Sequence, residues 1–199
     1  MVEAIPIAER RELTVSYRTL DTPIGALLVA ATEAGVVRIA FGTADEDAVL
    51  GDLAARLSAR IEAAPGRVDA LARQLDEYFS RRRRVFELPV DLRLARGFRR
   101  RVLERLREVP FGTTISYGAL AAAVGSRAVR AAGSACATNP VPIVVPCHRV
   151  VRSDGSIGNY GGGVACKAAL LELESQTAGT VPGAMRSHPL PADHVDSLG

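Results

Sequence analysis

With 199 residues, 48% of them apolar, the chain is long enough for one large domain or two small domains with a sizeable core. Its net charge of +3 permits an anionic partner without requiring one. The sequence contains no secretory leader, no CxxC pair and no run of about eighteen apolar residues, so we expect a cytoplasmic protein without membrane spans or a disulfide framework.

Residues 1–93 predict a small α/β domain that begins with a flexible arm at residues 1–12. Hydrophobic runs separated by Gly-containing turns are typical of β-hairpins, and apolar positions at helical spacing follow them. A later apolar run contains Pro89, which cannot donate to a ladder and therefore favours an edge strand. The expected elements are hairpin strands within 14–41, helices at 45–63 and 68–80, and an edge strand at 85–92.

Residues 94–174 predict a mostly helical winged helix-turn-helix domain, followed by a flexible tail at residues 175–199. Two short helices joined by a glycine turn are typical of the helix-turn-helix, and a hairpin after them is typical of a wing. The expected elements are an amphipathic helix at 98–109, a helix from its N-cap Ser116 to Gly125, a helix at 128–138, two short strands around 153–156, and a last helix at 167–174.

The second short helix, AVRAAGSACAT, consists of small residues with one long charged side chain, Arg130. A helix that reads base edges presents Asn, Gln, Arg or Lys, whereas small residues let the backbone approach a groove closely. The pattern therefore fits DNA binding with little sequence preference, or an Ala-rich helix packed in a core.

The arginine run at 81–84 also has two interpretations, because it can contact nucleic acid or form a solvated face paired with nearby acidic residues.

Cys147 and His148 follow an apolar run that contains three prolines. Prolines exclude a helix and hold a bend in place. A lone cysteine is often a small buried hydrophobe, but a thiol becomes a nucleophile when a base is in reach and a third group orients that base. Glu172 and Glu174 are the candidate orienting groups. His148 has no partner at zinc-ligand spacing, so we expect no metal.

Three segments together resemble the O6-alkylguanine-DNA alkyltransferases, or methylated-DNA–protein-cysteine methyltransferases. PVPIVVPCHRVV followed by GNYGGGVACKAALLELE is similar to their active-site region, and FGTTISYGALA and AVRAAGSACATNP precede it in the same order. The close resemblance covers residues 98–174, whereas the N-terminal part agrees in size, elements and the TPIG turn. The resemblance implies a ribonuclease H-like sheet with helices, joined to the winged helix-turn-helix domain.

The resemblance further implies direct-reversal DNA repair, in which the alkyl group of O6-alkylguanine moves irreversibly to Cys147 in one suicidal turnover. His148 would deprotonate the thiol through a water, and Glu174 would orient the imidazole. The implied catalytic residues are Cys147, His148, Glu174, Asn139 and Tyr117; the DNA-binding residues are Arg130 as an intercalating finger, Ala131, Ser134 and Tyr117; and the pocket residues are Pro142, Val150, Tyr160 and Gly161.

The implied partner is double-stranded DNA with an alkylated guanine, bound through the minor groove by a monomer. O6 lies inside the duplex, so the nucleotide must be flipped into a pocket. The resemblance leaves open whether O4-alkylthymine is a second substrate and whether binding along DNA is cooperative. No cofactor is implied, and the zinc ligands of some relatives' N-terminal domains are absent.

Two other functions compete with this one. A winged-helix protein could flag alkylated DNA or regulate transcription, with Cys147 incidental, and a cysteine hydrolase could turn over a small ester or amide without DNA. Neither alternative explains the helix-turn-helix and the PCHRV motif together.

Overall fold

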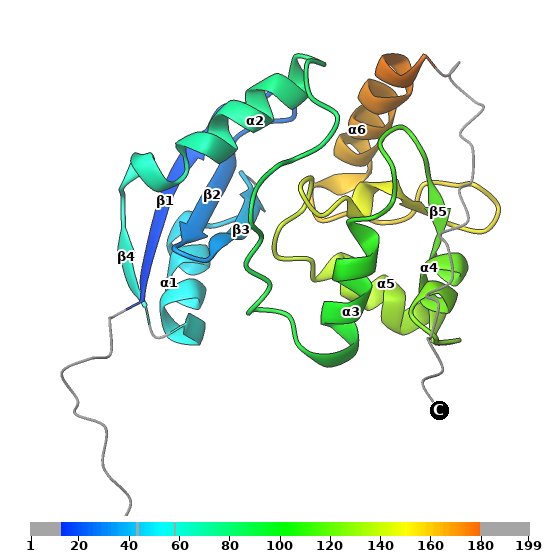
Figure 1. Cartoon of the computed structure of the whole chain (residues 1–199), viewed down its shortest axis with the longest axis horizontal. Coiled ribbons are helices and arrows are strands. Elements are labelled where there is room, and N and C mark those ends of the chain that lie inside the picture. The colour runs from blue at the N-terminus through cyan, green and yellow to red at the C-terminus, as the bar shows by residue number, and fades with distance from the viewer. Residues whose placement is uncertain (1–12, 43, 58, 180–199) are drawn as a thin grey trace, which may run out of the picture.

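The computed structural model describes residues 13–42, 44–57 and 59–179, which form two halves lying side by side (Figure 1). The N-terminal half contains a four-stranded sheet in the order β3-β2-β1-β4. Its strands are β1 (Thr14–Leu20), β2 (Leu27–Thr32), β3 (Gly35–Phe41) and β4 (Arg60–Glu62). The first three strands pair antiparallel, as the hairpin pattern predicts, and β4 pairs parallel with β1.

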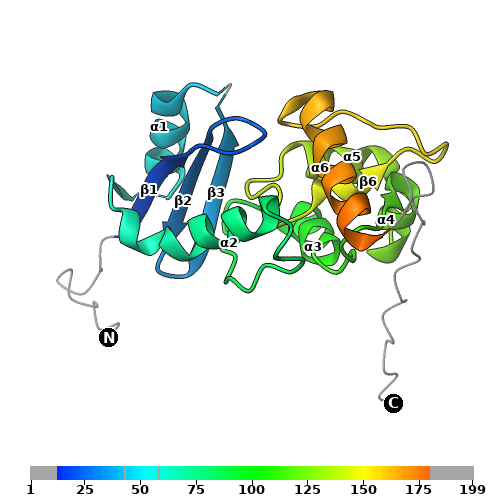
Figure 2. The ribbon, with the colours of Figure 1, turned by 90° about the horizontal axis from the view of Figure 1, so that it is seen from above.

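Two helices cover opposite faces of this sheet (Figure 2). Helix α1 (Glu46–Leu57) buries Val49 and Leu53 against one face, and helix α2 (Asp69–Phe79) buries Leu71 and Leu75 against the other. A short 3₁₀ helix, η2 (Pro65–Arg67), precedes α2. All six residues of β2 are buried because both faces of this central strand are covered.

Two sequence predictions in this half were wrong. The helix predicted at 45–63 ends at Leu57, and part of the remaining segment pairs with β1 as β4. The edge strand predicted at 85–92 forms only one isolated bridge, between Val36 and Val90. Both segments are short and take their conformation from distant partners, which local spacing does not reveal.

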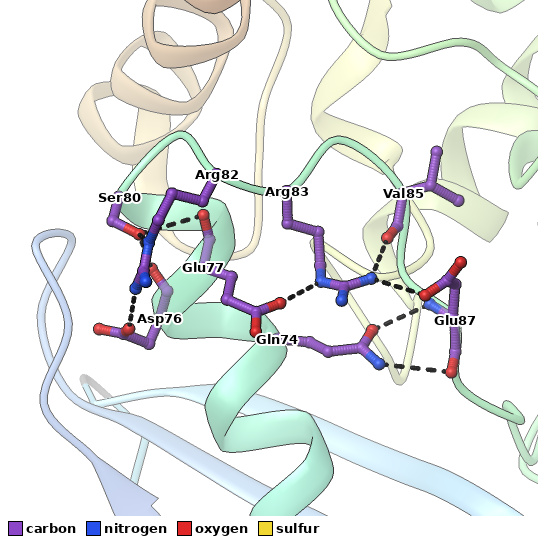
Figure 3. Close-up of polar contacts among 8 residues, drawn as sticks. All are labelled: Gln74, Asp76, Glu77, Ser80, Arg82, Arg83, Val85 and Glu87. Atoms are coloured by element: carbon purple, nitrogen blue, oxygen red, sulfur yellow. Dashed lines mark hydrogen bonds and ion pairs between the residues drawn. The ribbon is translucent and has the colours of Figure 1, made fainter.

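The arginine run at 81–84 ties the start of the interdomain segment (residues 80–96, between α2 and α3) to the ends of helices, so its four side chains are not free. Arg83 contacts Glu77 at 2.6 Å, Glu87 at 3.2 Å and the carbonyl of Val85, and Arg82 contacts Asp76 at 2.8 Å (Figure 3). The two outer arginines extend to the last helix, where Arg81 donates to Gln176 and Arg84 to the carbonyl of Thr177. Of the two interpretations of this run, the structure supports pairing.

The C-terminal half, as described up to residue 179, contains four α-helices and a two-stranded parallel sheet. Its elements are α3 (Gly97–Leu106), β5 (Ile115–Ser116), α4 (Tyr117–Ala123), α5 (Val129–Ala137), the 3₁₀ helix η3 (Cys147–Arg149), β6 (Val150–Val151) and α6 (Gly163–Ala178). The hydroxyl of Ser116 accepts a hydrogen bond from the backbone N–H of Ala119, which confirms the predicted N-cap of α4.

The predicted wing hairpin was wrong in its pairing. No two strands flank residues 153–156; instead β6 pairs parallel with β5, far back in the chain. The segment after β6 is a turn in which the N–H of Arg152 donates to the carbonyl of Ser156. Helix α6 begins earlier than predicted and continues through the first residues of the expected tail to Ala178. The expected arm at 1–12 and the tail from residue 180 lie outside the described residues.

The two halves share one hydrophobic core. A single cluster of buried side chains includes Leu75 and Tyr78 of α2, Leu103 and Leu106 of α3, and Cys147. This continuity holds the N-terminal sheet and α2 against the segment that carries the cysteine. Within the described part of the chain, every helix is too short or too polar to cross a membrane.

Candidate active site

The segment from Asn139 to Cys147 is a bent loop fastened by the Asn139 side chain. Oδ1 of Asn139 accepts from the N–H of Val141 at 3.0 Å, and Nδ2 donates to the carbonyl of Val145 at 2.8 Å. Ile143 has a φ of 74°, a conformation that a β-branched residue adopts only when its surroundings impose it. The loop is therefore held in a shape that its sequence would not adopt alone.

Cys147 begins η3 at the end of this loop and is almost fully buried. Nδ2 of Asn139 also donates to its Sγ, at 3.1 Å. Burial raises the pKa of Cys147 to about 11, because a thiolate is poorly solvated there, and the Asn139 amide offsets part of this effect. The thiol is therefore protonated at neutral pH and needs a base to become a nucleophile.

His148, the residue after Cys147, forms a buried pair with Glu174. Nε2 of His148 lies 2.8 Å from Oε1 of Glu174, and both side chains are almost completely enclosed. Burial lowers the pKa of His148 and the carboxylate offsets only part of the shift, so the imidazole is neutral at neutral pH. With its Nε2–H donated to Glu174, the ring keeps its lone pair on Nδ1, which is buried and has no protein partner among the described residues.

The Glu174 carboxylate has further partners that the sequence analysis missed. Arg149 donates to it from Nε and Nη2, both at 2.9 Å, and the backbone N–H of Gly112 donates at 3.0 Å. The hydroxyl of Tyr78, in α2 of the N-terminal half, donates at 2.8 Å. Burial alone would raise the pKa of Glu174, but His148 and Arg149 outweigh it and hold this pKa well below its ordinary value.

Arg149 could have been found in the sequence, since it adjoins His148 in the PCHRV motif. The role of Tyr78 had no sequence signal, because it lies 96 residues from Glu174. Glu172, the other candidate for orienting His148, is exposed and accepts from Gln176 instead.

Lys167 is a buried cation that the sequence analysis also missed. Its Nζ donates to the carbonyl of Val150 at 2.5 Å and lies 5.8 Å from the ring centre of Tyr117. Burial lowers the pKa of Lys167, while the thiols of Cys147 and Cys136 act in the opposite direction. The ammonium group ties α6 to β6 and adds positive charge near the two cysteines.

A cavity of about 390 Å³ opens over Cys147. Three of the four expected wall residues line it, namely Pro142, Tyr160 and Gly161. The fourth, Val150, is fully buried in β6 and does not line this cavity. Phe41 of β3 also lines it and packs edge-on against Tyr160, so the N-terminal half contributes to the wall.

The expected DNA-contacting residues lie on α5, the second helix of the helix-turn-helix, and at the start of α4. Arg130, Ala131 and Ser134 are exposed on α5. On the opposite side of the helix, Ala132 and Ala135 are buried in the core. Helix α5 therefore has both an exposed face that is free to meet DNA and a face packed in the core. Tyr117 is half-buried beside Gly158, where an added Cβ would lie only 2.9 Å from its hydroxyl.

These features define a two-domain protein in which a helix-turn-helix stands beside a buried thiol, a histidine–glutamate pair and an open cavity. The chain belongs to the 6-O-methylguanine DNA methyltransferase family. The family's ribonuclease-like domain matches residues 15–92, and its DNA binding domain matches residues 97–176. The two domains of this family explain the sheet with its helices and the helical half that carries Cys147.

Individual relatives agree with this assignment. The chain is 39% identical over 179 residues to the human methylated-DNA–protein-cysteine methyltransferase, covering 85% of this chain and 84% of the relative. The crystal structure of Mycobacterium tuberculosis OGT in complex with DNA matches with a TM-score of 0.70 at 36% identity, covering 81% of this chain and 94% of that one. The Escherichia coli bifunctional transcriptional activator/DNA repair enzyme Ada is 38% identical over 167 residues; the match takes in 82% of this chain but spans only 46% of that longer relative.

Proposed function

We propose that this protein repairs DNA by direct reversal, moving the alkyl group of O6-alkylguanine irreversibly to its own Cys147. The observation that carries this proposal is the position of the Cys147 thiol. It lies under an open cavity and beside the Asn139 amide, and the next residue in the chain, His148, is paired with Glu174. Relatives of similar length carry the name of this activity, and one was solved with DNA.

The first step is removal of the thiol proton. Nδ1 of His148 carries the free lone pair because Glu174 holds the Nε2–H, so Nδ1 is the base, acting through one water. Arg149 and Tyr78 keep Glu174 ionised and in place, which fixes the tautomer of the imidazole. The Asn139 amide donates to Sγ and stabilises the thiolate as it forms.

In the second step the thiolate attacks the alkyl carbon, a sulfur–carbon bond forms and the carbon–O6 bond breaks. The departing guanine takes up one proton, assisted by the Tyr117 hydroxyl, which balances the proton lost by the thiol. The product is a thioether on Cys147 and an unmodified guanine. The site contains no group that would cleave a thioether among the described residues, so each molecule acts once.

DNA binding is assigned to the helix-turn-helix. The exposed face of α5 has small residues that let its backbone approach the minor groove with little sequence preference, and Arg130 fills the space of the flipped nucleotide. Pro142, Tyr160 and Gly161 receive the flipped base over Cys147. On this proposal residues 94–174 bind DNA and accept the alkyl group, residues 1–93 support them, and the protein acts as a cytoplasmic monomer.

Mass spectrometry with defined DNA tests the proposal. Equimolar protein and a duplex carrying one O6-methylguanine should yield protein with one added methyl group, mapped to Cys147. The Cys147→Ala variant should gain none, and the Cys166→Ala variant should behave as the wild type. Tight binding to the lesion without any adduct would instead indicate a damage sensor, and repeated turnover of a small ester without DNA would indicate a hydrolase.

A further inference from the structure

A second cavity lies on the surface where the N-terminal half meets the start of α3. Its volume is about 390 Å³, and five residues line it: Arg56, Arg93, Leu94, Arg96 and Arg99. Four of the five are arginines, from α1, the interdomain segment and α3. We refer to these five residues as the arginine cavity.

The arginine cavity carries more positive charge than its acidic neighbours neutralise. Arg56 pairs with Asp52 at 3.3 Å, and Arg93 pairs with Asp91 at 2.6 Å. Among residues 13–42, 44–57 and 59–179, no carboxylate pairs with the two remaining arginines of the cavity. Two positive charges therefore lack a counter-ion within the described protein.

Two of the guanidinium groups in the arginine cavity bind the same backbone carbonyl, that of Leu94. Nη2 of Arg56 donates to the carbonyl of Leu94 at 3.1 Å, and Nη2 of Arg99 donates to the same carbonyl. Two like charges on one carbonyl repel each other, and a bound anion would relieve this repulsion. Helix α3 begins at this rim, and its N-cap residue Arg96 makes no side-chain cap bond, so the partly positive helix end adds to the field.

The arginine cavity adjoins the cavity over Cys147. Arg56 and Arg99 line both cavities. Nη1 of Arg99 also reaches the hydroxyl of Thr138, the C-cap residue of α5, at 3.5 Å. An anion bound here would therefore sit beside the end of the recognition helix and beside the entrance for the flipped nucleotide.

We propose that the arginine cavity binds a backbone phosphate of the DNA duplex held by the helix-turn-helix, so that the N-terminal half contributes directly to DNA binding. Arginine guanidinium groups bind phosphate oxygens in pairs of hydrogen bonds, and four of them in one cavity match a phosphodiester. The inference rests on the proposed DNA partner, because a free phosphate has the same chemistry. Position favours the duplex, because Arg99 of the cavity contacts Thr138 at the end of α5.

The salt dependence of binding to undamaged duplex DNA tests this proposal. Fluorescence anisotropy would give the Kd at several KCl concentrations for the wild type and for Arg96→Gln and Arg56→Gln. Each phosphate contact contributes about −0.9 to the slope of log K against log salt. Removing the contact should weaken binding at low salt and make the slope less steep by about one unit.

Arg82→Gln is the matched control, since it removes the same charge from an exposed pair at the end of α2. It should leave the slope unchanged. The Arg96 side chain makes no hydrogen bond or ion pair with the described residues, so its substitution should not alter the urea unfolding midpoint. Slopes equal to the wild type in both cavity variants would overturn the proposal.

A competition experiment distinguishes a DNA phosphate from a free anion as the ligand of the arginine cavity. Inorganic phosphate at constant ionic strength should compete weakly and equally against the wild type and Arg96→Gln. Strong competition confined to the wild type, without any change in the salt slope, would assign the cavity to a free anion and overturn the duplex assignment. Because the DNA is undamaged, a failure of methyl transfer would leave these binding results unaffected.

Discussion

The hydroxyl of Tyr78 in α2 donates a 2.8 Å hydrogen bond to Oε1 of Glu174 in α6, the same oxygen that accepts from His148. Both Tyr78 and Glu174 are almost completely buried. This bond links the N-terminal half to the carboxylate that orients the candidate base. The N-terminal half is thus part of the active-site structure, and substitutions there have consequences at the thiol.

Replacing Tyr78 by Phe keeps the ring in the core and removes only the hydroxyl. We expect a loss of about 1.5–3 kcal/mol in unfolding free energy, because a buried hydrogen bond to a charged group is removed. Urea denaturation would measure it, together with the rate of methyl transfer, which should fall as His148 loses orientation. Tyr17→Phe is the control, since the Tyr17 hydroxyl makes no hydrogen bond within the described residues, and equal losses in the two variants would contradict this assignment.

Replacing Glu174 by Gln should lower stability and methyl transfer more than replacing Tyr78 by Phe. It leaves the buried Arg149 without a counter-charge, which destabilises proteins by about 3–5 kcal/mol, and an amide can also donate to His148 and reverse its tautomer. Methyl transfer should drop at least tenfold. Glu172→Gln removes an exposed carboxylate from the same helix and should leave both stability and transfer unchanged. If the two variants behave alike, the Glu174 pair has no special role.

The same carboxylate sets a pH dependence of stability. The folded-state pKa of Glu174 lies below its ordinary value of 4.5, so its stabilising contribution is complete above that pH and is lost as the pH falls through the folded pKa. The difference in unfolding free energy between the wild type and Glu174→Gln should therefore shrink from pH 7 to pH 3. Urea titrations across this range would measure it. A constant difference would show that the charge of Glu174 does not contribute.

The Cys147 thiol should lose its proton only at an unusually high pH. Burial raises the pKa of Cys147 to about 11, so its alkylation by iodoacetamide should still accelerate steeply with pH above about pH 10, where an ordinary thiol is already almost fully ionised. Asn139→Ala removes a donor to Sγ and should slow alkylation at pH 8 several-fold by raising this pKa further. Thr138→Ala is the control, because the Thr138 hydroxyl donates to the carbonyl of Ser134. The Cys136→Ala, Cys166→Ala background confines the signal to Cys147.

Two neighbouring arginines in the 81–84 run should differ in importance. Arg83 contacts Glu77, Glu87 and the Val85 carbonyl, whereas Arg82 forms an exposed pair (Figure 3). Arg83→Gln should lower the urea midpoint clearly more than Arg82→Gln, because several contacts that order the interdomain segment are lost together. Neither should change the salt slope of DNA binding. A weaker slope in both variants would favour a nucleic-acid role for the run.

Local pattern was sufficient for much of the fold. Alternating apolar positions and glycine turns predicted β1 to β3, and helical spacing predicted α2, α3, α4 and α5 near their observed positions. These elements depend on side chains a few residues apart, which the sequence displays directly. The predictions failed at β4, at residues 85–92 and at the wing, where a few residues pair with a strand far along the chain.

The active site likewise combines residues that the sequence indicated with residues that only the fold revealed. The sequence by itself indicated Cys147 and His148, which are neighbours in one motif, and left Glu172 and Glu174 as alternatives on one helix, while Asn139 came from the family resemblance. Only the tertiary structure decided that Glu174 and not Glu172 faces His148, that Tyr78 completes this carboxylate, and that arginines from three segments converge on one cavity. Burial, charge compensation and cavity shape depend on groups distant in sequence, and those distances exist only in the folded chain.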